Sequence, residues 1–272
     1  MLSLSLKNFV MKKSMFSKIK QSFLIAALLA LSGATSGQVM WQHTYGTPEN
    51  DDFGRWAIPN MAGGYSFVGH TESWGAGDLD ILFVEVDTCG LMIKSTIVRD
   101  KHKEKGRHLV EDPVTGDIWL TGKSNTKSSG SQDVRVFNLT AISGHSSGSG
   151  SNIGGSMSDN GHSIQKTMDG GYIVAGRTSS FGGGSFDIYL IKLSATGAML
   201  WAKTYGGTGS ETANMVRETF DGGFIVCGHS KSFSADGTRD VYLLRTDPTG
   251  TVLWGKTYGS IFPGTDDAYD VR

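Results

Sequence analysis

The stretch Asp169–Gly207, DGGYIVAGRTSSFGGGSFDIYLIKLSATGAMLWAKTYGG, decides the fold, because the chain repeats it from Asp221 as DGGFIVCGHSKSFSADGTRDVYLLRTDPTGTVLWGKTYGS. Short runs of apolar residues are separated by glycine, aspartate and proline, which favour tight turns. Each unit therefore predicts four β-strands joined by hairpin turns. For the later unit we expect them at Thr212–Thr219, Gly223–His229, Val241–Thr246 and Val252–Tyr258.

Two markers show that this unit recurs with a period of about 53 residues. A glycine that closes an apolar run recurs at spacings of 53, 54 and 52, and a later aspartate recurs at 53, 54 and 53. The markers are Gly69, Gly122, Gly176 and Gly228, with Asp80, Asp133, Asp187 and Asp240. One four-stranded antiparallel sheet per repeat is typical of a β-propeller blade. A sandwich or solenoid could hold the same strands, but sandwiches do not repeat their sequence and solenoid coils are usually shorter.

The all-β propeller is expected to be incomplete. Blade-like periods fall near residues 41–94, 95–150, 151–201 and 202–254, with a partial one at 255–272, or about 4.4 blades. A closed propeller usually has more. We expect either a truncated chain or a ring completed by self-association.

Two further details concern the register of the repeats. Acidic residues recur ten positions before each hairpin turn, at Asp52, Asp159, Glu211 and then Asp267, and we expect the last residues, DDAYDVR, to match the start of an innermost strand. In the second period we expect the last strand to be replaced by the glycine- and serine-rich stretch AISGHSSGSGSNIGG.

Residues 1–37 have the order of a secretory signal peptide. Lys12, Lys13, Lys18 and Lys20 form a basic start before the apolar run Phe23–Leu31, and small residues follow it. This run is too short to span a bilayer, so the mature chain is expected to have no membrane span. Cleavage would remove five lysines and no acid, leaving 20 basic against 26 acidic residues and a net charge of −6. We expect a secreted or outer-surface protein that does not bind nucleic acid.

The strings LSATGAMLW and TDPTGTVLW resemble the strand-turn-strand element of quinoprotein-type propellers. The fuller pattern, WxxTYGG, DGG[YF]IVxG and DxYL, is similar to repeats of secreted Bacteroidetes-type propeller proteins. The resemblance implies the fold and export, often through the type IX route, but little chemistry. The resemblance to quinoprotein dehydrogenases would imply a quinone cofactor, usually with calcium and an adjacent cysteine pair. In this chain, however, Cys89 and Cys227 are far apart in sequence. We therefore expect no cofactor, and we assign Trp201 and Trp254 to docking between sheets.

No pattern identifies a catalytic or metal site. The chain has no HExxH or CxxC motif, and its arginines look too scattered to form the cluster that sialidase-type propellers need. The stretch His102–His108, HKEKGRH, is interpreted as a solvated polar loop. We predict no catalytic residues and no metal ligands.

The best binding candidates lie around the loop between the second and third strands of each blade. They are His70, Trp74, Arg177, Phe181, His229 and Phe233. Aromatic rings with flanking polar groups on one face suit a carbohydrate or protein ligand. Alternatively, the rings pack between blades and the recurrent aspartates cap loop amides. We predict a non-catalytic binding module. The alternatives are a polysaccharide hydrolase or lyase with catalytic residues in missing blades, and a purely structural repeat.

Overall fold

The structure, a computed structural model, describes residues 42–48, 50–74, 79–98, 103–125, 132–139, 150–259 and 264–272. The predicted signal peptide lies outside them. The described part contains sixteen β-strands and no helix, so the all-β prediction is confirmed.

The strands form four antiparallel sheets of four strands, each ordered along the chain. Sheet 1 comprises β1 (Asp52–Pro59), β2 (Tyr65–Thr71), β3 (Asp80–Val86) and β4 (Met92–Val98). Sheet 2 comprises β5 (Glu104–Glu111), β6 (Ile118–Ser124), β7 (Asp133–Asn138) and β8 (Ser151–Ile153). Sheet 3 comprises β9 (Asp159–Lys166), β10 (Tyr172–Thr178), β11 (Asp187–Leu193) and β12 (Met199–Tyr205). Sheet 4 comprises β13 (Glu211–Glu218), β14 (Phe224–Ser230), β15 (Asp240–Thr246) and β16 (Val252–Tyr258).

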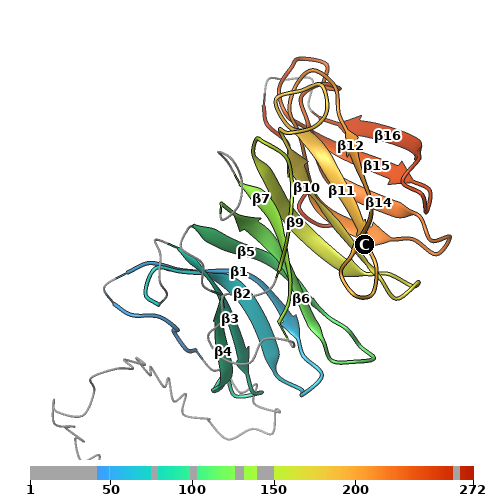
Figure 1. Ribbon diagram of the computed structural model, residues 1–272. Coiled ribbons are helices and arrows are strands. Elements are labelled where there is room, and N and C mark those ends of the chain that lie inside the picture. Colours follow the sequence, from blue (N-terminus) through green and yellow to red (C-terminus); the bar gives the residue numbers. More distant parts are fainter. Residues whose placement is uncertain are drawn as a thin grey trace, which may run out of the picture.

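The sheets follow one another like the blades of a propeller, from blue to red in Figure 1. The first strand of each later sheet packs against the first three strands of the sheet before it. The first strands therefore line the inner edge of the arrangement. The hydrophobic core lies in the seams: Val68 and Leu109 meet between sheets 1 and 2, and Ile173 and Val226 between sheets 3 and 4.

The repeated glycine has a steric cause. The first strand of every sheet contains a β-bulge, which brings its backbone against the glycine of the second strand. A Cβ on Gly176 would overlap the carbonyl oxygen of Asn160, and one on Gly122 would overlap that of Lys105. Backbone cannot yield as a flexible side chain can, so only glycine fits.

The predicted hairpin turns and inter-sheet contacts are both present. Gly170 and Gly222 adopt φ angles of +84° and +78°, which the DGG turns require.

Trp201 of β12 packs against the hydrophobic core between sheets 3 and 4. Its ring is edge-on to that of Phe224, with ring centroids 6.1 Å apart. The docking role predicted for Trp201 is therefore confirmed. Trp254 of β16 is 40% exposed, so the docking role predicted for it stays a prediction.

Three expectations about details were wrong. The stretch interpreted as a solvated loop contains most of β5, in which Glu104 and His108 are buried. The last strand of sheet 2 is present as the three-residue β8. Asp266, rather than Asp267, takes the position of Glu211. The Asp266 N–H donates to the carbonyl of Arg239 at 2.7 Å, as the Glu211 N–H does to that of Phe186.

The phase of the sheets also differs from the sequence periods. A sheet begins at the acidic residue of its first strand. The 94/95, 201/202 and 254/255 boundaries therefore fall inside β4, β12 and β16.

Candidate functional site

The predicted binding residues lie at one end of the sheets, where each second strand ends and each first strand begins. His70, Arg177 and His229 occupy equivalent positions on β2, β10 and β14. The loops after these strands carry the aromatic residues. The DGG turns lie at the opposite end. We call the end with the aromatic loops the loop face.

The two histidines are largely buried and have different neighbours. His70 is 1% exposed and stacks on Phe53 at 4.8 Å between ring centroids. Burial, followed by the charge of Lys105, lowers its pKa to about 4. His229 is 8% exposed, and its Nδ1 contacts the carboxylate of Asp267. Burial lowers the pKa of His229, whereas Asp267 acts to raise it.

Arg177 lies over the ring of Phe186, with its guanidinium carbon 4.2 Å from the ring centroid. Its buried Nε has no hydrogen-bond partner among the described residues. Burial lowers the Arg177 pKa, and the charge of Arg239 adds to this effect. This side chain is therefore partly desolvated without forming an ion pair in the described part of the chain.

The aromatic residues fall into two groups. Phe181 and Phe233 are 44% and 46% exposed. Each is tilted over a tyrosine of its own sheet, Tyr189 at 5.8 Å and Tyr242 at 5.3 Å between ring centroids. Trp74 is half-buried against the apolar cluster of sheet 1. An exposed phenylalanine ring over a buried tyrosine therefore recurs in neighbouring sheets.

The acidic residues of the first strands hold these loops in place. The hydroxyl of Ser180 donates to Asp159 at 2.7 Å, and the N–H of Ser232 donates to Glu211 at 2.9 Å. The same carboxylates accept the N–H groups of Gly155 and Gly207, each at 2.8 Å, from the loops that enter the sheets. The predicted capping of loop amides by recurrent acids is present at Asp159 and Glu211.

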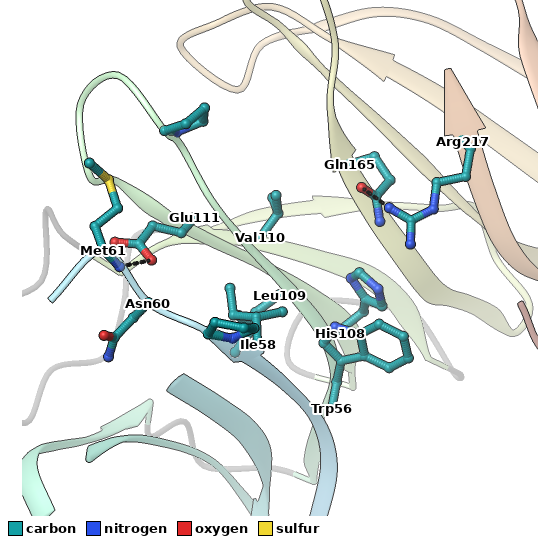
Figure 2. A pocket seen from close by; sticks show the side chains of 12 residues that line it. Trp56, Ile58, Asn60, Met61, His108, Leu109, Val110, Glu111, Gln165 and Arg217 are labelled. Atoms are coloured by element: carbon teal, nitrogen blue, oxygen red, sulfur yellow. Dashed lines mark hydrogen bonds between the residues drawn. The ribbon is translucent and has the colours of Figure 1, made fainter. Parts of the chain in front are cut away.

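A pocket of about 430 Å³ lies along the inner edge, among the first strands of all four sheets (Figure 2). Trp56 of β1 stacks on His108 of β5 with ring centroids 4.3 Å apart. Across the pocket, Arg217 of β13 donates to Gln165 of β9 at 3.0 Å. Burial, with the nearby charge of Arg217, lowers the His108 pKa to about 3, so the ring is neutral near pH 7.

Sequence reasoning missed a group of basic residues near the loop face. They are Arg55 of β1, Lys105 and Arg107 of β5, Lys123 of β6 and Arg177 of β10. We call these five residues the basic cluster. The arginines that looked scattered are thus partly gathered. The acidic repeat could have located β5, because Glu104 follows Asp52 by one period.

Neither a cluster of metal-ligating side chains nor a membrane-spanning helix occurs within the described residues. These residues contain no group of three or more histidine, cysteine, aspartate or glutamate side chains that could hold a metal ion. In the same part of the chain, no helix is long and apolar enough to cross a membrane.

No protein-family model matches this chain, and no protein with a curated description does. Its fold is similar to the crystal structure of a protein of unknown function from Bacteroides caccae, with a TM-score of 0.46 and 12% identity. That match covers 80% of this chain and 70% of the other.

Proposed function

We propose that this chain is a non-catalytic binding module of a secreted or cell-surface protein, and that its loop face contacts a carbohydrate. The observation that carries the proposal is the pair of exposed rings, Phe181 and Phe233, at equivalent places in sheets 3 and 4. An exposed ring beside polar loops offers an apolar face for stacking a sugar, with hydrogen-bonding groups close by.

Preorganisation of the loops also supports this proposal. Each exposed ring rests on a tyrosine, and its loop is bonded to the buried carboxylate of Asp159 or Glu211. A loop held in place before binding loses less conformational entropy when a ligand arrives. Two such rings repeated along the arrangement suit a polymer with repeating units.

Binding to polysaccharides tests the proposal. The purified protein would be incubated with beads that carry cellulose, chitin, xylan, polygalacturonate or carrageenan, and a hexasaccharide of any polymer that retains it would then be titrated by calorimetry. We expect saturable binding that weakens at least about tenfold in the F181A/F233A variant, because truncating an aromatic anchor typically costs about 2 kcal/mol.

Phe220 provides the matched control. It is fully exposed in a DGG turn, at the end opposite the loop face. F220A should therefore bind like the wild type. Absence of binding to every polysaccharide, or equal binding by the F181A/F233A variant, would contradict the proposal. Release of shortened sugars would instead indicate the hydrolase or lyase alternative.

A further inference from the structure

The register of the inner strands brings the basic cluster together. Lys105 of β5 pairs directly with Lys123 of β6, so two like charges face each other across one ladder position. Such pairs are normally destabilising. Arg107 is the bulge residue of β5, and Arg55 is the bulge residue of β1. Both are therefore extra residues on first strands that line the inner edge.

The positive charge of the cluster is not neutralised within the described residues. None of the five side chains forms an ion pair there. Lys123 Nζ donates to the neutral side chain of Gln132 at 2.7 Å, and Arg177 rests on the ring of Phe186. The charge of Glu72 acts to raise the Lys105 pKa, but the two side chains form no ion pair within the described residues.

The members of the cluster act on one another although they come from three sheets. Burial and then the charge of Arg107 lower the Lys123 pKa to about 8. Burial lowers the Arg107 pKa, with further contributions from Arg55 and Arg177. Partly desolvated cations that repel one another and form no ion pair are stabilised by an anion that binds among them.

We propose that the basic cluster binds the carboxylate or sulfate groups of an acidic saccharide. This inference rests on the proposed carbohydrate-binding function and specifies the ligand class. Guanidinium groups bind such oxyanions through paired hydrogen bonds, and the ammonium groups add point charges.

Position and overall charge favour an acidic saccharide over a nucleic acid. The cluster lies toward the loop face, and Arg177 directly contacts Phe186 in the loop that also carries Phe181. A sugar ring on the aromatic pair would therefore have its charged groups near the cluster. The whole chain has a net charge of −1. It therefore lacks the broad excess of basic residues that recognition of a nucleic-acid backbone requires.

The test compares oligosaccharides of equal length and different charge. Hexagalacturonate supplies carboxylates, a carrageenan hexasaccharide supplies sulfates, and cellohexaose is neutral. We expect one acidic ligand to bind at least roughly tenfold more tightly than cellohexaose, because a hydrogen bond to a charged group adds roughly that factor. This advantage should shrink as salt is added.

Two double variants show whether the cluster is responsible. R107Q/K123Q removes two charges of the basic cluster, and K94Q/K256Q removes two exposed charges on the outermost strands β4 and β16. We expect R107Q/K123Q to bind all three sugars alike and K94Q/K256Q to retain the preference. Circular dichroism would verify that both variants fold.

Several results would overturn the inference. The first is an equal affinity of the wild type for acidic and neutral sugars. If F181A/F233A still abolished that binding, the proposed function would survive alone. Retention of the acidic preference by R107Q/K123Q would also overturn it, as would equally tight binding of inorganic sulfate or short single-stranded DNA. Failure to bind any sugar would remove both proposals.

Discussion

The inner edges of sheets 3 and 4 differ from those of sheets 1 and 2 at one equivalent position, the bulge residue of the first strand. In sheet 3, Nδ1 of His162 lies 2.9 Å from the carbonyl oxygen of Ala213. In sheet 4, the side-chain amide of Asn214 donates to the carbonyl of Ala268 at 2.8 Å. In sheets 1 and 2, Arg55 and Arg107 occupy this position and make no such bond within the described residues.

The comparison separates what the fold requires from what it leaves free. The bulge and the glycine packed against it are present in all four sheets, although the bulge residue varies from arginine to histidine and asparagine. The neutral side chains contact the backbone of the segment that follows: His162 contacts Ala213 of sheet 4, and Asn214 contacts Ala268. A cationic side chain instead adds charge at the inner edge, and sheets 1 and 2 therefore supply most of the basic cluster.

The largest expected effect tests whether the packing of the glycine against the bulged strand is equally strict in sheets 1 and 2 and in sheets 3 and 4. G122A in sheet 2 and G176A in sheet 3 should each destabilise the protein by about 3 kcal/mol or more, because the new methyl group overlaps a backbone carbonyl. Urea denaturation would measure both losses. Similar losses are expected despite the different bulge residues.

Gly54 provides the control for these substitutions. It lies beside the bulge in β1, has open space around its missing Cβ, and corresponds to Ala213 in sheet 4. G54A should be nearly neutral. If G122A also changed the stability very little, sheet 2 would not share the steric constraint that holds Gly176 in sheet 3.

Sequence reasoning found the frame accurately because turn chemistry repeats. In sheet 4 every predicted strand end lies within one residue of the observed end. The inner strand β5 was missed because its buried alternate residues include Glu104, Gly106 and His108, which do not look apolar. Burial of polar residues depends on partners in other segments, and local pattern does not reveal it.

The basic cluster was missed for a related reason. Its members are far apart in the sequence and come together only through the bulges and the packing of successive first strands. The ring of aromatic residues, by contrast, was predicted from equivalent positions in successive sequence repeats. The structure places Phe181 and Phe233 at the surface, whereas Trp74 packs into sheet 1.

A smaller effect concerns acid stability. Burial, followed by the charge of Arg107, lowers the His162 pKa to about 3. The unfolded chain therefore takes up a proton first, and stability should fall as the pH drops from about 6.5 toward 3. H162N imitates Asn214 of sheet 4. It should keep stability near pH 7 and regain about 1–2 kcal/mol at pH 4.5.

Thermal unfolding of wild type and H162N across this pH range measures the difference. N214H reverses the exchange and should make the protein more sensitive to acid. Parallel pH profiles for wild type and H162N would show that His162 takes up its proton at the same pH in the folded and unfolded chains, contrary to this account.

The smallest expected effect concerns the like-charged pair in sheet 2. K123Q should raise stability at pH 7 by about 0.5–1 kcal/mol, since it relieves repulsion from Lys105.

The same variant should change the pH dependence of stability. Because the folded-state pKa of Lys123 is lowered to about 8, the unfolded chain retains the Lys123 proton to higher pH. Wild-type stability should therefore rise between about pH 8 and 10.5, and K123Q should flatten this slope. K94Q, on the exposed outer strand, should change neither quantity. A loss of stability in K123Q would show that the bond to Gln132 outweighs the repulsion, and that sheet 2 tolerates its charge without needing an anion.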